Sequence, residues 1–267
     1  MNKIYSIICL SIACVLIVIG AFFDLSITQG LYIGENAFSL ILEIIGQTFM
    51  TFLSAFCFIV LFEYLKDKNT FWYSVLKVGF VLASFLLVLY DFFSLYRATW
   101  FLVCAVFVSG GIVFGMWFIV KKAPKEMLEK YKGFCIKFLI FIAIIFVLNQ
   151  GVKYLWGRPR YSDLITTLSL ADFRPFWSPD FFSGYKSFYS GHTTAVCSIL
   201  PLIILVSSTN LSKGKKILIN SSIIFFILLT MFSRLLAGDH FISDVAFAFL
   251  ICYLICLLVF KKTKIKQ

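Results

Sequence analysis

The chain contains two histidines, and both stand among residues that suit phosphate chemistry. His192 directly follows Ser190 and Gly191, and His240 precedes Asp244 by four positions. Residues four apart share one face of a helix, so Asp244 can hold one ring nitrogen of His240 and leave the other free to attack. His192 can then protonate the departing oxygen. An imidazole suits both tasks because its ordinary pKa, about 6.5, lies near neutral pH.

Several cations accompany these histidines. Lys153, Arg158 and Arg160 stand together in one segment, and Arg234 lies shortly before the second histidine. Guanidinium groups bind the oxygens of a phosphate in a forked geometry, and a helix that begins near Ser190 would direct free backbone N–H groups toward an anion. Phosphoryl transfer needs charge neutralisation, an in-line nucleophile and a proton for the leaving oxygen. The residues therefore predict a site for that chemistry.

The elements that position these residues are predicted to be membrane-spanning helices. Hydrophobic residues make up 61% of the chain and its mean hydropathy is +0.97, which excludes an ordinary soluble domain. Apolar runs of about 18 or more residues cross a bilayer as helices. We read the first run as a retained helix, since no small-residue cleavage site follows it. We expect an all-α, polytopic membrane helical bundle of about eight transmembrane helices, near residues 4–23, 40–64, 74–92, 98–120, 133–152, 192–207, 215–234 and 242–260.

The net charge of +11 reflects membrane topology rather than nucleic-acid binding. When the helices are threaded in order, the lysine-rich segments 121–132, 213–216 and 261–266 fall on one side. The positive-inside rule places that side, and both termini, in the cytoplasm. The catalytic candidates then emerge together on the opposite face. We expect an integral protein of a bacterial plasma (inner) membrane whose active site faces the extracytoplasmic side.

The remaining polar residues and the cysteines carry less information. The eight cysteines lie in or beside apolar runs and none pairs with another at metal-ligand spacing, so neither disulfides nor zinc are expected. Glu43, Gln47, Glu63 and Asp91 lie near predicted helix ends, where solvated or snorkelling polar groups are common. An intramembrane carboxylate is nonetheless a functional candidate.

Three motifs in the second half of the chain resemble those of the type 2 phosphatidic acid phosphatase (PAP2) superfamily. The family pattern is K-x6-R-P, then P-S-G-H, then S-R-x5-H-x3-D, and the resemblance covers roughly residues 133–260. Tyr161 and Tyr189 stand where the pattern has prolines, and Phe247 stands near where a glycine often follows the last motif. The matching residues are Lys153 with Arg160, then Ser190, Gly191 and His192, then Ser233, Arg234, His240 and Asp244.

This resemblance implies a role for each matching residue. His240 would be a nucleophile that forms a phosphohistidine, Asp244 its orienting partner and His192 the general acid. The implied phosphate-binding residues are Lys153, Arg160, Ser190, Gly191 and Arg234, with Arg158, Tyr161 and Tyr189 as auxiliary candidates. No metal and no other cofactor is implied. The implied fold is a six-helix core, so residues 1–72 would be an elaboration of two helices, and residues 73–267 the catalytic bundle with an interfacial loop at 153–189.

The reaction predicted from these observations is metal-independent hydrolysis of a lipid phosphate or diphosphate at the outer leaflet. Polyprenyl diphosphate, phosphatidic acid, phosphatidylglycerophosphate and lipid A phosphate are the candidate substrates. A phosphotransferase would use the same residues and is the alternative. A non-catalytic lipid-phosphate binder or transporter has little need for two histidines and an aspartate, and a vanadate-dependent oxidase does not suit a site at a bilayer surface. The partners expected are the lipid substrate and the bilayer, with neither nucleic acid nor an obligatory protein partner.

Overall fold

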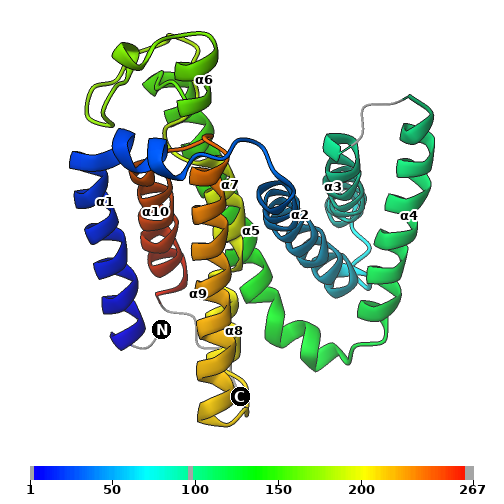
Figure 1. The fold of residues 1–267 in the computed structure, drawn as a ribbon. Coiled ribbons are helices and arrows are strands. Elements are labelled where there is room, and N and C mark those ends of the chain that lie inside the picture. The colour runs from blue at the N-terminus through cyan, green and yellow to red at the C-terminus, as the bar shows by residue number, and fades with distance from the viewer. Residues whose placement is uncertain (1–2, 96–98, 262–267) are drawn as a thin grey trace. The chain divides into compact units, whose positions relative to one another are not determined.

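A computed structural model of the chain describes residues 3–95 and 99–261, and every regular element within those ranges is helical. The chain ends, including residues 262–266 of the basic C-terminal segment, lie outside the described residues. The predicted all-α class is confirmed. In chain order the elements are α1 (Lys3–Leu31), α2 (Ala37–Leu65), α3 (Phe71–Leu95), α4 (Thr99–Lys121), α5 (Lys125–Trp156), α6 (Tyr161–Thr166), η1 (Leu170–Asp172), α7 (Gly191–Val196), η2 (Cys197–Ile199), α8 (Leu202–Ser207), α9 (Lys213–Leu236) and α10 (Ile242–Phe260) (Figure 1).

The described part of the chain contains seven helices that are long and apolar enough to cross a membrane. The protein is therefore an integral membrane protein, as predicted. One of the eight predicted runs, 192–207, is shorter than a full span, because Gly191–Ser207 is divided among α7, η2 and α8. Pro201 precedes α8 directly. Proline has no N–H to donate to the preceding turn, so one hydrogen bond of a regular α-helix is missing there.

The chain divides into two compact units. Unit 1 comprises Met1–Gly46 and Ala143–Leu258, and unit 2 comprises Gln47–Ile142 and Val259–Gln267. The helices α2 and α5 are long and each contributes to both units. The boundary predicted at residue 72 assigns helices to a family core and stays a prediction.

Unit 1 is built around α9 and α10. Helices α1, α7 and α8 pack against α9 (Figure 1). Helix α1 also approaches α10 closely: a Cβ atom on Gly20 would lie 2.8 Å from the Cβ of Ser243. The inner face of α10 buries Phe249, Cys252 and Tyr253 almost completely. This apolar packing holds the start of α10, which carries Asp244, against its neighbours.

The segment between α5 and α7 covers one end of these helices, with α6 in it (Figure 1). It departs from α5 at Gly157, which has a φ of +64° and packs so tightly that a Cβ would lie 1.8 Å from the Asp180 carbonyl oxygen. Only glycine fits there. Aromatic rings hold the segment down, with ring centroids 4.9 Å apart for Trp156–Phe188 and for Phe176–Phe247.

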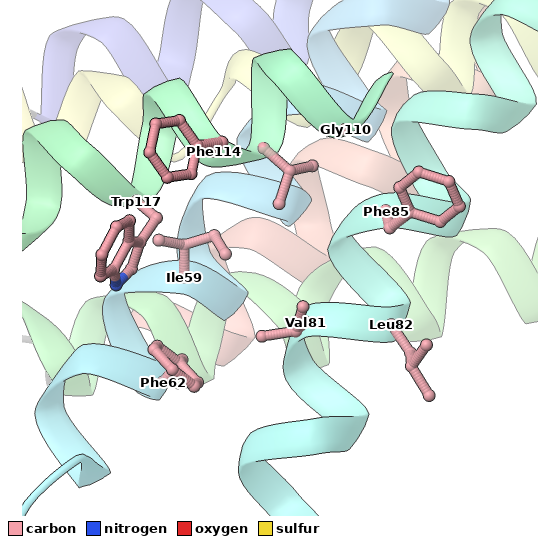
Figure 2. A pocket seen from close by; sticks show the side chains of 9 residues that line it. Ile59, Phe62, Val81, Leu82, Phe85, Gly110, Phe114 and Trp117 are labelled. Carbon is pink, nitrogen blue, oxygen red and sulfur yellow. The ribbon is translucent and has the colours of Figure 1, made fainter. Parts of the chain in front are cut away.

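Unit 2 contains an apolar hollow. Its volume is about 380 Å³, and it is lined from α2, α3 and α4 by side chains such as Ile59, Phe85 and Phe114 (Figure 2). Helices α3 and α4 pack directly against each other. The lining residues carry neither a titratable nor a nucleophilic side chain, so this hollow offers no catalytic chemistry.

Candidate active site

The structure brings the predicted site segments together within unit 1. The backbone N–H of Ser190 donates to the carbonyl oxygen of Asp244 at 3.2 Å. The rings of His192 and His240 lie with their centroids 6.2 Å apart. Residues far apart in the chain therefore form one cluster at the start of α10.

The imidazole of His240 is fully buried beside the carboxylate of Asp244. The two residues do not share a helical face as predicted, because His240 precedes α10 and Asp244 lies in its first turn. Its Nδ1 lies 3.8 Å from Asp244 Oδ2, which is an ion-pair distance rather than a hydrogen bond. That same oxygen accepts hydrogen bonds from Ser187 Oγ at 2.6 Å and from the Phe241 N–H at 2.9 Å. Among the described atoms, no hydrogen-bond partner reaches either ring nitrogen of His240. The carboxylate is thus fixed, while the imidazole keeps a nitrogen available for attack.

Arg158 lies behind this pair. Its side chain is 1% exposed, and its guanidinium binds Asp244 Oδ1 at 2.5 Å and Asp24 Oδ2 at 2.8 Å. Its Nε donates to the Arg174 carbonyl oxygen, and the Phe241 ring lies 4.3 Å away in cation–π geometry. These contacts make Arg158 a support for Asp244, whereas the sequence suggested an auxiliary contact with phosphate.

Asp24 is a part of this support that sequence reasoning missed. It lies on α1, far outside the predicted motifs, and accepts the backbone N–H of Ser243 at 2.9 Å as well as the Arg158 guanidinium. The only signal for it in the sequence is a carboxylate within an apolar run, which marks a functional candidate in a membrane protein.

The rim of the site is a chain of alternating charges. Arg160 and Arg234 both contact Asp239, at 3.1 and 3.3 Å. Arg234 also contacts Glu43 Oε2 at 2.6 Å, and Glu43 Oε1 lies 2.9 Å from His192 Nε2. The side chain of Arg234 is 1% exposed, whereas those of Arg160 and His192 are 36% and 25% exposed. The cluster therefore opens outward along Arg160 and His192.

Sequence reasoning named Glu43 only as one of several polar residues near predicted helix ends, and it did not single out Asp239. Asp239 stands between two motif residues, so its position was a weak signal. The side chain of Glu43 is 32% exposed and engaged with both a histidine and an arginine, rather than being a freely solvated or snorkelling group.

Ser190, Gly191 and Lys153 occupy the third side of the cluster. Ser190 is the N-cap of α7, and its Oγ accepts the Thr193 N–H at 3.2 Å, so the helix start expected there is confirmed. A Cβ on Gly191 would lie 3.0 Å from the Lys153 amine, so glycine allows the amine to approach the backbone. The backbone of Arg160 is held by Asp163, whose carboxylate accepts the Arg160 backbone N–H at 2.8 Å.

Tyr161 and Tyr189, the other auxiliary candidates, are placed in apolar clusters. Tyr161 is buried against Phe241 and Leu164, and its ring centroid lies 5.1 Å from that of Tyr32. Tyr189 is buried with Phe188, and its backbone carbonyl accepts a hydrogen bond from Asn149 at 2.9 Å. These contacts indicate packing roles for both rings.

One group of residues on the rim has the composition of a metal site. Glu43, His192 and Asp239 offer ligand atoms within 4.8 Å of one another. Both carboxylates, however, already contact Arg234, and Asp239 also contacts Arg160. A cation there would have to displace guanidinium groups and face their charge at close range. The arrangement favours an anion, and the independence from metal stays a prediction.

The burial of His240 predicts that its imidazole is uncharged at neutral pH. Removal from water, together with the nearby positive charge of Lys153, lowers the pKa of His240 to about 4. The imidazole is then neutral and nucleophilic at neutral pH. Between about pH 4 and 6.5 the unfolded chain binds a proton that the folded chain excludes, so the folded state loses stability as the pH falls through that window.

The chain's two histidines allow a direct measurement. In a His192→Gln variant, His240 is the remaining imidazole, and its ¹⁵N chemical shifts can be followed in detergent. We expect a neutral ring down to about pH 5. A titration centred near the ordinary histidine value of about 6.5 would contradict the buried, desolvated environment described above.

Comparison with known proteins adds one finding. Neither the curated proteins nor the solved structures give a match to the chain. Residues 134–266 match the family model described as the PAP2 superfamily. That range contains Lys153, Arg160, Arg234 and both histidines, whereas Asp24 and Glu43 lie outside it. Through its C-terminal half, the chain thus belongs to the PAP2 superfamily, as its three motifs predicted.

Proposed function

We propose that this protein is a membrane phosphatase that hydrolyses the phosphate or diphosphate headgroup of a lipid through a phosphohistidine intermediate. The observation that carries the proposal is the pair of imidazoles, 6.2 Å apart, with Asp244 beside one of them. A binding protein would need the cations but has no use for a buried imidazole beside a carboxylate. Membership of the PAP2 superfamily supports phosphatase activity on phosphate esters.

Each residue of the cluster has a task in this reaction. A ring nitrogen of His240 attacks phosphorus, the bond to the ester oxygen breaks, and His192 supplies the proton that this oxygen takes up. Asp244 stabilises the positive charge that develops on the His240 ring. Water then attacks the phosphohistidine and releases inorganic phosphate.

The phosphate oxygens would bind between the arginines. In the structure, the Asp239 carboxylate bridges Arg160 and Arg234. Two oxygens of a phosphate can replace this bridge, with Lys153 adding a third positive charge. Gly191 would contribute its backbone N–H at the start of α7, whereas the N–H of Ser190 donates to the Asp244 carbonyl oxygen and Ser190 serves as the N-cap that places Gly191. No cofactor has a part in these steps.

The lipid nature of the substrate is supported by the surroundings of the site. The site is built on helices apolar enough to cross a membrane. The covering segment exposes Trp177, Phe181 and Phe182 by more than half of their surface, and aromatic rings of this kind settle at headgroup depth. The distribution of lysines supports an extracytoplasmic site that acts on the outer leaflet, and we propose a bacterial inner membrane as its location. Polyprenyl diphosphate, phosphatidic acid, phosphatidylglycerophosphate and lipid A phosphate all carry the required group.

The proposal is tested by phosphate release from these four lipids, using purified protein in detergent with EDTA in excess. We expect release from at least one lipid, unchanged by EDTA, and a large loss in Asp244→Asn, because the amide cannot stabilise a positive imidazole. No release from any lipid would contradict the proposal, and loss of release in EDTA would indicate a metal mechanism. Radioactive phosphate found on a second lipid, rather than in solution, would identify a phosphotransferase.

A further inference from the structure

Both imidazoles of the site contact a carboxylate through one nitrogen and leave the other without a partner. His240 has Asp244 near its Nδ1. His192 has Glu43 Oε1 at 2.9 Å from its Nε2, and its Nδ1 is buried with no hydrogen-bond partner among the described atoms. A carboxylate on one ring nitrogen fixes the orientation of the ring and stabilises its protonated form. The second pair therefore has the form of a general acid with its own carboxylate.

The start of α2, which carries Glu43, is fixed against α7 and α9, two of the helices that supply the site. A Cβ on Gly46 would lie 3.3 Å from the Cβ of Val196 on α7, the helix that also carries His192. Ser39 Oγ donates to the Ser233 carbonyl oxygen on α9 at 2.9 Å, and the Arg234 guanidinium donates to the Ser39 carbonyl oxygen. The carboxylate of Glu43 is therefore presented to His192 from a segment that packing holds in place.

We propose that Glu43 is the positioning residue for His192, holding the ring by its Nε2 so that its Nδ1 delivers the proton to the leaving oxygen. This inference rests on the proposed function and deepens it. Glu43 lies on α2, outside the range that matches the family. The inference therefore assigns a function in the reaction to an N-terminal helix. Protonation of the leaving oxygen matters most for an alkyl phosphate, such as a lipid ester, because an alkoxide is a poor leaving group.

The proton can be followed through both steps. As a nitrogen of His240 bonds to phosphorus, the phosphorus–oxygen bond of the ester breaks, and the oxygen leaves as an alcohol with the proton from His192. The ring of His192 is then neutral and faces the phosphohistidine. Water attacks phosphorus, gives its proton back to His192, and the bond between phosphorus and His240 breaks. Glu43 stays ionised throughout and stabilises the charged form of His192 before and after each turnover.

The test compares two soluble esters, a short-chain alkyl phosphate and p-nitrophenyl phosphate, in wild type and in Glu43→Gln. The nitrophenolate leaves without a proton, so only the alkyl ester depends on the general acid. We expect the ratio of kcat/KM for the alkyl ester to that for the aryl ester to fall about 10²-fold. The ratio cancels any change in phosphate binding through Arg234 and any loss of folded protein, because both affect the two esters alike.

Asp239→Asn is the matched control. Asp239 contacts the same Arg234 guanidinium as Glu43, but of the two carboxylates it is Glu43 that pairs with His192. We expect Asp239→Asn to change kcat/KM for both esters by the same factor. In a His192→Ala background, Glu43→Gln should lower the ratio no further, since a positioning residue acts only through its partner.

The outcomes separate this inference from the proposed function. If wild type hydrolyses both esters and Glu43→Gln lowers or raises both equally, Glu43 acts only on phosphate binding and the inference is wrong. If wild type hydrolyses neither these esters nor any of the four lipids, the phosphatase proposal itself fails, and the inference fails with it.

Discussion

Replacing His240 by alanine is expected to lower phosphate release at least about 10⁴-fold, the effect seen when a nucleophile that acts within a catalytic unit is removed. The ring is fully buried beside Asp244, and both of its nitrogens lack a hydrogen-bond partner among the described atoms. The loss should appear for alkyl and aryl phosphates alike, because every substrate needs the nucleophile. Initial rates of phosphate release in detergent measure it.

His192→Ala is the informative comparison for this variant. It removes the chain's other imidazole, yet an aryl phosphate does not need its proton, so we expect the aryl ester to retain far more activity than the alkyl ester. Binding of a non-hydrolysable phosphonate lipid should persist in His240→Ala, because Arg160 and Arg234 remain. Turnover by His240→Ala within about tenfold of wild type would exclude His240 as the nucleophile.

The second large effect is on folding stability. Arg158→Gln removes the cation that Asp24 and Asp244 share, and these two side chains are 2% and 0% exposed. Breaking a buried ion pair from one side leaves uncompensated charge and costs about 3–5 kcal/mol. We expect a loss of that size in the free energy of unfolding, measured by denaturation in detergent.

Arg174→Gln supplies the control, since Arg174 also pairs with an aspartate but with both side chains more than 40% exposed. Exposed pairs of this kind contribute about 0–1 kcal/mol. Adding Asp24→Asn to Arg158→Gln should restore part of the stability, because one of the two buried negative charges disappears. If Arg158→Gln is as stable as Arg174→Gln, the two aspartates do not depend on Arg158.

The candidate catalytic residues could be identified from the sequence because they stand at short, fixed spacings within their motifs. The four-residue interval between His240 and Asp244 indicated that the two side chains meet, although through the start of α10 rather than along one face of it. The order of apolar helices indicated that the motif segments share an end of the bundle. Ser190 as a helix start follows from the same local rules.

The supporting residues could not be predicted in this way. Asp24 and Glu43 meet partners that lie 134 and 191 positions away in the chain, and no local rule connects them. Arg158 and Arg160 are chemically equivalent in the sequence, yet the fold buries the first between two aspartates and leaves the second 36% exposed on the rim. Tertiary packing distinguishes the two arginines, and Arg158 directly follows the tightly packed turn at Gly157.

The most direct test of the account is to trap the phosphoryl group on the enzyme. Purified protein is mixed with radiolabelled phosphate ester, quenched rapidly in alkali, and digested to locate the label. We predict a label on the peptide that contains His240, stable in alkali and lost in acid as a phosphoramidate is, and absent from His240→Ala. A label on any other residue, or one that persists in His240→Ala, would contradict the assignment of His240 as the nucleophile on which the proposed reaction depends.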